Sequence, residues 1–130
     1  MTFRSAGVDL AGSLLPPTGQ PVRAAAVIIA SSGPIDRDGD APRAPLSVSR
    51  NLAASLAGSG IATLRYDKRG VGASGGEFLG AGRSDNIDDA RAALAAVADD
   101  TACAGVPLFL IGHSEGAAIA TVLGAESSLP

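Results

Sequence analysis

A serine between two glycines, in the pattern G-x-S-x-G, can present its hydroxyl as a nucleophile at a sharp turn. The pattern occurs around Ser114 in residues 112–116 (GHSEG) and around Ser74 in residues 72–76 (GASGG). Chance supplies about 0.2 matches in a chain with this much glycine and serine, so the flanking segments must decide. Only Ser114 lies directly between a strand-like apolar run and a helix-compatible run. We therefore predict that Ser114 is the nucleophile and that its turn requires both flanking glycines.

A nucleophilic serine also needs hydrogen-bond donors for the negative charge that forms on the attacked oxygen. In a turn of this kind, the backbone N–H of Glu115 points at that oxyanion. The second donor must come from the loop after the preceding parallel strand, where residues 31–34 (SSGP) are placed. We expect a backbone N–H of Ser32 or Gly33 to supply it. An ordinary turn without this role is the alternative.

The general base that would activate the serine is missing from the sequence. The one histidine is His113, and a sharp turn at Ser114 is expected to direct its ring away from the serine hydroxyl. Residues 117–130 contain Glu126 but no histidine. We therefore expect that residues 1–130 lack a complete serine–histidine–acid triad and are inactive alone.

The segments that position these residues alternate between strand and helix. Apolar runs predict strands at 24–30, 61–66 and 107–111, after a polar, proline-rich lead-in. Helical spacing predicts three helices, which run from Ser47 or Ser49 to Gly58 or Gly60, from Ser84 or Asp85 through Val97, and over 116–124. This order is typical of an α/β fold with a mainly parallel sheet and helices on both faces.

Ligands of such a sheet bind beyond the carboxyl ends of its strands, here the loops 31–40, 67–82 and 112–116. Several charged residues in or near these loops have two interpretations. Asp67 and Arg69 could line the site, but structural ion pairs are favoured. Residues 36–38 (Asp36, Arg37 and Asp38) could touch substrate or shape the loop, but a solvated loop is favoured. In the following helix, Asp89 is expected on the side away from the core.

Residues 70–75 (GVGASG) match the dinucleotide-binding pattern G-x-G-x-x-G. Three charged residues separate this run from the strand before it, and residues 76–82 are a poor helix start for binding a pyrophosphate. A nucleotide-binding domain is therefore a disfavoured interpretation, and it would require tight NAD(P) binding at this loop.

The composition limits the classes of partner. A chain of 130 residues with a formal charge of −3 is one domain with no basic surface for nucleic acid or anionic membrane. One cysteine, Cys103, excludes an internal disulfide, and no Cys/His spacing suggests zinc. No apolar run reaches the roughly 18 residues of a spanning helix. We expect a cytoplasmic protein without metal or cofactor, in which Cys103 only packs.

Three stretches together resemble an α/β-hydrolase: residues 27–33, residues 64–74 and residues 110–116. The loop 32–38 is similar to that of esterase- and peptidase-like members related to prolyl oligopeptidases and dienelactone hydrolases. The resemblance implies that Ser114 becomes acylated and that Glu115 lends its N–H. It also implies further strands, an acid and a histidine after the nucleophile helix. Residues 1–130 are then the N-terminal part of a single, truncated α/β-hydrolase domain that ends after that helix.

The preferred interpretation is thus a serine hydrolase that cleaves a carboxylic ester or a related acyl bond of a small-molecule substrate. The alternative is a non-catalytic interaction module that keeps the sheet but not the chemistry. In either case, the strand at 107–111 is expected to leave an exposed apolar edge through which the isolated chain self-associates.

Overall fold

The three predicted apolar runs form the parallel part of a five-stranded sheet. In the computed structural model, which describes residues 1–126, they are β3 (Ala24–Ile29), β4 (Ile61–Tyr66) and β5 (Leu108–Gly112). β3 lies between β4 and β5 and is parallel to both. Every residue of β3 after Ala24 is buried, which explains why this strand is a continuous apolar run without alternation.

A hairpin that the sequence analysis missed adds two strands. β1 (Thr2–Ser5) and β2 (Val8–Leu15) are antiparallel, and β2 is also antiparallel to β4, so the sheet is mixed with the order β1-β2-β4-β3-β5. The connecting residues Ala6 and Gly7 both have positive φ, 45° and 84°, as a type I′ hairpin turn requires. Because Ala-Gly is not a usual sequence for such a turn, the segment resembled a lead-in.

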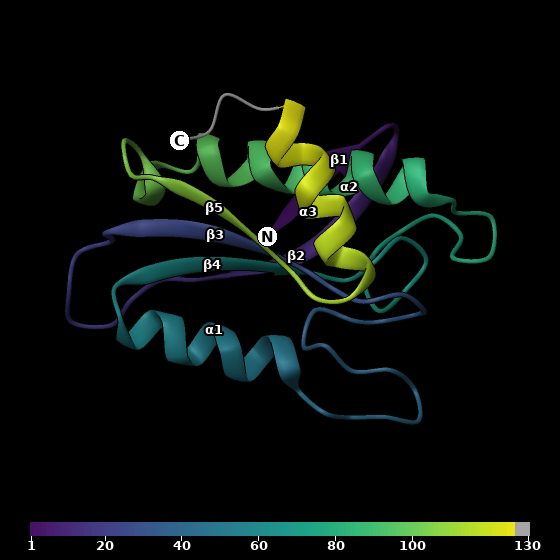
Figure 1. Ribbon diagram of the computed structural model, residues 1–130, viewed down its shortest axis with the longest axis horizontal. Coiled ribbons are helices and arrows are strands. Elements are labelled where there is room, and N and C mark those ends of the chain that lie inside the picture. The colour runs from purple at the N-terminus through teal and green to yellow at the C-terminus, as the bar shows by residue number, and fades with distance from the viewer. Residues whose placement is uncertain (127–130) are drawn as a thin grey trace.

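Helices cover both faces of the sheet, as the sequence predicts (Figure 1). α1 (Val48–Gly58) packs against β4 on one face. α2 (Arg83–Asp99) and α3 (Glu115–Glu126) lie on the other, against β3 and β5 respectively. A short 3-10 turn, η1 (Thr101–Cys103), follows α2 and buries Cys103. The α/β class is thereby confirmed, whereas the expected domain end at residue 130 lies outside the described residues.

The loop before α1, and not a serine side chain, accepts the hydrogen bonds of the free N–H groups at the start of that helix. Ser47 precedes α1 with φ 52° and makes no side-chain capping bond. Instead, the carbonyl of Asp38 accepts the N–H groups of Ser49 and Arg50, each at 3.1 Å. This loop is therefore tied to α1, although the sequence suggested a serine cap.

The expected position of Asp89 is wrong. Its side chain is buried in α2, with 1% of the residue exposed. Arg69, just after β4, donates to both carboxylate oxygens, at 2.6 and 3.2 Å. A buried carboxylate is tolerated when a paired guanidinium compensates its lost hydration. The prediction of a structural ion pair for Arg69 is confirmed.

Candidate active site

Ser114 lies at the turn between β5 and α3. It has φ 57°, in the left-handed region that non-glycine residues rarely adopt, and it is exposed. The turn is closed by Gly116 N–H donating to the His113 carbonyl at 3.0 Å and by Ala117 N–H donating to the Ser114 carbonyl at 2.9 Å. Residue 114 is thus outside both the strand and the helix, in the strained conformation that a nucleophile turn requires.

The two glycines around this turn are explained by close backbone approach. A Cβ atom on Gly112 would overlap the backbone of Gly116 and Ala117, and one on Gly116 would overlap the carbonyls of Ile29 and Ala30. The start of α3 is therefore packed directly on the end of β3. A side chain at either glycine would separate the helix from the sheet or change the turn.

The N-terminus of α3 offers a free donor beside Ser114. Glu115 is the first residue of the helix, so its N–H has no acceptor inside the helix. None of the backbone hydrogen bonds within residues 1–126 uses this N–H outside the helix either. The helix dipole adds partial positive charge at the same end, which favours a negative ligand.

The loop after β3 brings Ser32 and Gly33 to the same end of the sheet. Ile29 is in register with Gly112 in β5, and its carbonyl accepts the N–H of His113 at 3.1 Å. Gly33 has φ +94°. In the described part of the chain, neither Ser32 nor Gly33 donates a backbone–backbone hydrogen bond. Both candidate donors are therefore available near the start of α3.

Asp67 holds the β3–α1 loop in place through hydrogen bonds of its carboxylate. Its carboxylate accepts the backbone N–H of Arg37 at 2.8 Å, the Arg37 guanidinium at 2.9 Å and the N–H of Ala73 at 2.9 Å. Burial alone would raise the pKa of Asp67, but these hydrogen bonds from Arg37 and Ala73 lower it below its ordinary value. The favoured solvated-loop interpretation is wrong for Arg37, which instead joins the loop to the end of β4.

The second G-x-S-x-G serine also has a structural role. Ser74 Oγ donates to the Asp67 carbonyl at 2.6 Å and accepts the N–H of Ala11 at 2.9 Å. A Cβ on Gly72 would overlap the Asp67 carboxylate. The loop 67–82 therefore folds over Asp67, and Ser74 links Asp67 to β2.

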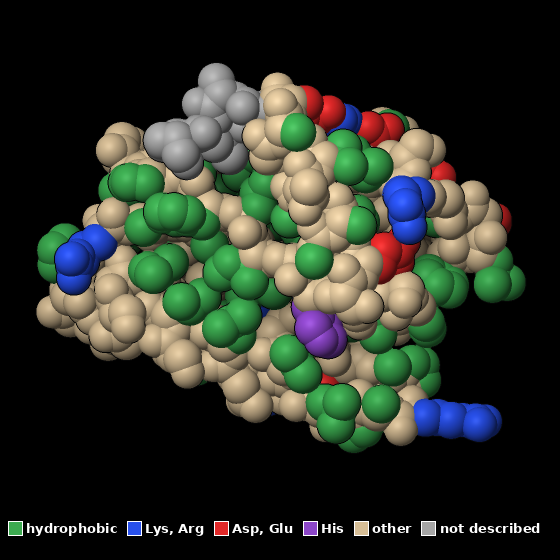
Figure 2. All heavy atoms as spheres, in the orientation of Figure 1, with side chains coloured by type: hydrophobic (Ala, Val, Ile, Leu, Met, Phe, Trp, Pro, Cys, Tyr) green, Lys and Arg blue, Asp and Glu red, His purple; other side chains and the backbone are tan. Residues whose placement is uncertain are grey.

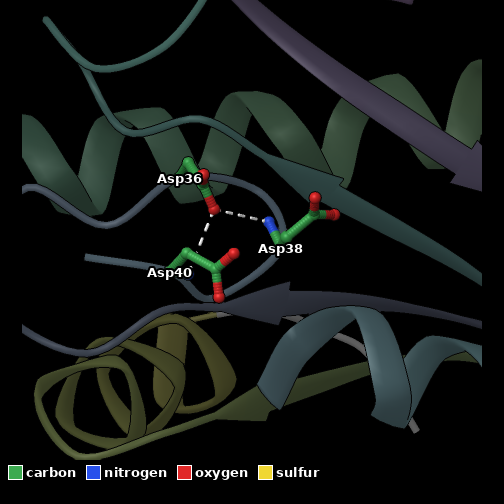
Figure 3. A group of neighbouring side chains, drawn as sticks. All are labelled: Asp36, Asp38 and Asp40. Carbon is green, nitrogen blue, oxygen red and sulfur yellow. Dashed lines mark hydrogen bonds between the residues drawn. The ribbon is translucent and has the colours of Figure 1, made fainter. Parts of the chain in front are cut away.

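Three carboxylates in the β3–α1 loop lie close together but already have partners (Figure 3). Oxygen atoms of Asp36, Asp38 and Asp40 all lie within 4.8 Å of one another. Asp36 accepts the backbone N–H groups of Asp38 and Asp40, Asp38 pairs with Arg65, and Asp40 accepts the N–H of Ser47. These bonds hold the shape of the loop, so the cluster does not by itself make a metal site.

A small cavity lies beside the serine turn. It has a volume of about 170 Å³ and is lined by His113, Ser31 and mainly small or apolar side chains of the β3–α1 loop and α1. His113 is exposed, and the histidine appears in Figure 2 at the surface, next to hydrophobic side chains. Among the hydrogen bonds of residues 1–126, none joins its ring to Ser114.

The sequence analysis did not single out Lys68. It lies two residues after the end of β4 and is buried, with 8% of the residue exposed, and its Nζ atom donates to the carbonyl of Ser31 at 3.1 Å. A charged residue at the carboxyl end of a buried parallel strand is the signal that could have identified it.

Comparisons with known proteins identify the family and agree with the fold. A family model described as serine aminopeptidase, S33, matches residues 46–129. A solved esterase of Pyrococcus furiosus superposes with a TM-score of 0.80 at 19% identity, over 99% of this chain and 47% of that one. Est1E of Butyrivibrio proteoclasticus, solved with ferulic acid bound, gives 0.75 at 22% identity, over 97% and 47%.

A serine hydrolase homologue of Coxiella burnetii gives a TM-score of 0.77 at 21% identity, over 99% of this chain and 58% of that one. The chain thus spans about half the length of these structures. No curated protein sequence matches it significantly. Among the described helices, none is both long and apolar enough to cross a membrane.

Proposed function

Because the chain belongs to the S33 serine aminopeptidase family of α/β-hydrolases, we propose that it carries the nucleophile and the oxyanion hole of a serine hydrolase. The substrate is a small molecule with a carboxylic ester or a related acyl bond. The observation that carries the proposal is the exposed Ser114 at φ 57° directly before the free N–H of Glu115. The esterases among its structural neighbours support the choice of an acyl bond.

In the proposed reaction, Ser114 Oγ attacks the acyl carbon while a general base takes the hydroxyl proton. The carbonyl oxygen becomes an oxyanion that accepts hydrogen bonds from Glu115 N–H and from Ser32 or Gly33 N–H. Collapse of this intermediate breaks the bond to the leaving alcohol, which receives the proton from the base. Water then attacks the acyl-Ser114 ester by the same route and releases the acid.

The base and its orienting acid are proposed to come from sequence outside residues 1–130, as the family order of nucleophile, acid and histidine implies. The protein that contains them is called the full-length protein below. We place it in the cytoplasm, in keeping with a single, buried cysteine and no internal disulfide. Residues 1–130 are proposed to be the N-terminal part of one hydrolase domain.

The test is covalent labelling of the full-length protein with a fluorophosphonate, followed by mass spectrometry of the labelled peptide. We expect the label on Ser114 and its loss in Ser114→Ala. Ser74→Ala is the matched control, because Ser74 has the same glycine pattern but its hydroxyl is hydrogen-bonded to Asp67 and Ala11. The Ser74→Ala protein should still be labelled on Ser114. A full-length protein that stays unlabelled at Ser114 would favour the non-catalytic interaction module.

Activity measurements on the isolated chain test whether residues 1–130 lack the general base. Loss of the base costs on the order of 10⁶ in turnover, which leaves only binding and oxyanion stabilisation. Residues 1–130 alone should therefore hydrolyse p-nitrophenyl esters about 10⁶-fold more slowly than the full-length protein. Substantial hydrolysis by this chain would mean that it contains its own base.

A further inference from the structure

Lys68 contacts the loop that carries the candidate oxyanion donors at two points. Its Nζ atom donates to the Ser31 carbonyl at 3.1 Å, and its backbone N–H donates a longer bond of 3.4 Å to the Ile35 carbonyl. Ser32 and Gly33 lie between these two points. One residue at the end of β4 therefore holds both ends of the segment 31–35.

The contact at Ser31 determines where the Ser32 N–H points. A peptide unit is planar and trans, so the carbonyl of one residue and the N–H of the next point in opposite directions. Because the Ser31 carbonyl is directed at the Lys68 ammonium, the Ser32 N–H is directed away from it. That N–H has no intramolecular acceptor within residues 1–126, so it remains available for a ligand oxygen.

The surroundings of Lys68 keep its ammonium in one place. The Phe78 ring centroid lies 5.9 Å from Nζ, and 8% of the residue is exposed. Burial lowers the pKa of Lys68, while the nearby Glu115 carboxylate acts in the opposite direction and favours the charged form. The ammonium thus has a hydrogen bond to Ser31 on the loop and lies within the electrostatic influence of Glu115 at the start of α3.

Packing alone does not explain a lysine at this position. A buried ammonium costs free energy of hydration, and an apolar side chain of similar length would fill the same space without that cost. The charge of Lys68 lies where its Nζ atom donates to the Ser31 carbonyl. A role in orienting that peptide unit accounts for both the charge and its location.

We propose that Lys68 is a positioning residue of the oxyanion hole, which holds the Ser31–Ser32 peptide so that the Ser32 N–H faces the oxyanion opposite Glu115 N–H. This inference rests on the proposed serine hydrolase function. It selects Ser32 over Gly33 as the second donor. Lys68 itself touches neither substrate nor the reacting atoms.

The test compares Lys68→Met and Lys68→Arg in the full-length protein, with Arg91→Met as the control. Arg91 is a half-exposed cation on α2 that pairs with Asp88 and Glu126. In Lys68→Met, we expect kcat for ester hydrolysis to fall about 10- to 100-fold, because a misplaced donor acts on the transition state. KM should stay within about twofold, and the melting temperature should not fall.

A second readout reports on the oxyanion directly. A trifluoromethyl ketone adds to the serine and places a hemiketal oxyanion in the hole, so its affinity should fall in Lys68→Met by about the same factor as kcat. Lys68→Arg keeps a cationic donor and should recover part of both losses. Arg91→Met should change neither.

The inference is overturned by a folded Lys68→Met protein with wild-type kcat and inhibitor affinity. A Lys68→Met protein that does not fold, or that changes only KM, also overturns it, because the residue would then be structural. Failure of the proposed function gives a different result, in which Ser114→Ala retains full hydrolysis whatever Lys68→Met does.

Discussion

At the residue scale, the serine turn depends on the absence of two Cβ atoms. Gly116 lies against the Ile29 and Ala30 carbonyls, and Gly112 lies against the first turn of α3. Ser114 keeps its positive φ because the packed strand before it and the packed helix after it fix the direction of the backbone on both sides.

Gly116→Ala should therefore lower the free energy of unfolding by about 3 kcal/mol and abolish labelling of Ser114, because its Cβ overlaps backbone atoms that cannot move aside. Gly124→Ala is the matched control in the same helix. Its Cβ meets nothing within 4 Å, so it should raise stability by up to about 1 kcal/mol. Chemical denaturation checks both; equal effects of the two substitutions would contradict this account.

Asp67 is expected to make stability depend on pH. Its pKa is lower in the folded protein than its ordinary value of 3.8. A carboxyl of this kind contributes stability that is fully present above the unfolded pKa and is lost as the pH falls through the folded pKa. Asp67→Asn should lower the free energy of unfolding by about 2 kcal/mol at pH 7. This loss relative to the wild type should become smaller below about pH 4.

Urea denaturation at several pH values would measure this dependence. The control is Asp9→Asn, since the Asp9–Arg4 pair is exposed and should contribute less than about 1 kcal/mol. If the wild type and Asp67→Asn differ in free energy of unfolding by the same amount down to pH 2, the charge of Asp67 is not what holds Arg37.

At the element scale, the segment after β4 holds the β3–α1 loop at two points and α2 at one. Asp67 holds the β3–α1 loop through Arg37, Lys68 holds the Ser31 carbonyl, and Arg69 holds α2 through Asp89. Three consecutive side chains thus fix the loop at Ser31 and Arg37 and the helix at Asp89. This explains why the charges lie at the end of a buried strand.

Asp89→Asn should destabilise the protein by about 3 kcal/mol, because Arg69, a partly buried residue, loses its buried and closest carboxylate partner and keeps only the longer pair with Asp85 at 3.8 Å. Asp88→Asn is the neighbouring control on the same helix. Its pair with Arg91 is half-exposed, and its loss should cost about 0.5 kcal/mol or less. Thermal unfolding of both variants tests the difference, and similar losses would argue against a buried ion pair between β4 and α2.

At the scale of the whole molecule, β5 is the last strand of the sheet. It pairs with β3, and among the described strands none pairs with its other edge. Phe109 in this strand is 49% exposed. An unpaired parallel edge with an exposed aromatic side chain favours association between chains.

The isolated 130-residue chain should therefore dimerise or aggregate, and Phe109→Lys should reduce this association by placing a charge on the edge strand. Size-exclusion chromatography with light scattering measures both. A single peak of monomer mass, together with a sharp calorimetric unfolding transition, would contradict the prediction.

Much of the site could be predicted from local patterns. The strands at 24–29, 61–66 and 108–112 are apolar runs bounded by turn residues, and the glycines around Ser114 mark a turn whose steric demands are local. The hairpin at residues 2–15 was missed, because its strands are short and its turn has an unusual sequence. The burial of Asp89 was missed, because it depends on Arg69, twenty positions away in the chain.

The sequence by itself determined the α/β order of the elements, the sharp turn at Ser114 and the absence of a second histidine, because each follows from residue types and short spacings. Only the tertiary structure decided that Arg37 joins Asp67 and that Lys68 reaches the Ser31 carbonyl. These contacts link residues 30 and 37 positions apart. Such pairs form only when β3 and β4 lie side by side, which no local pattern records.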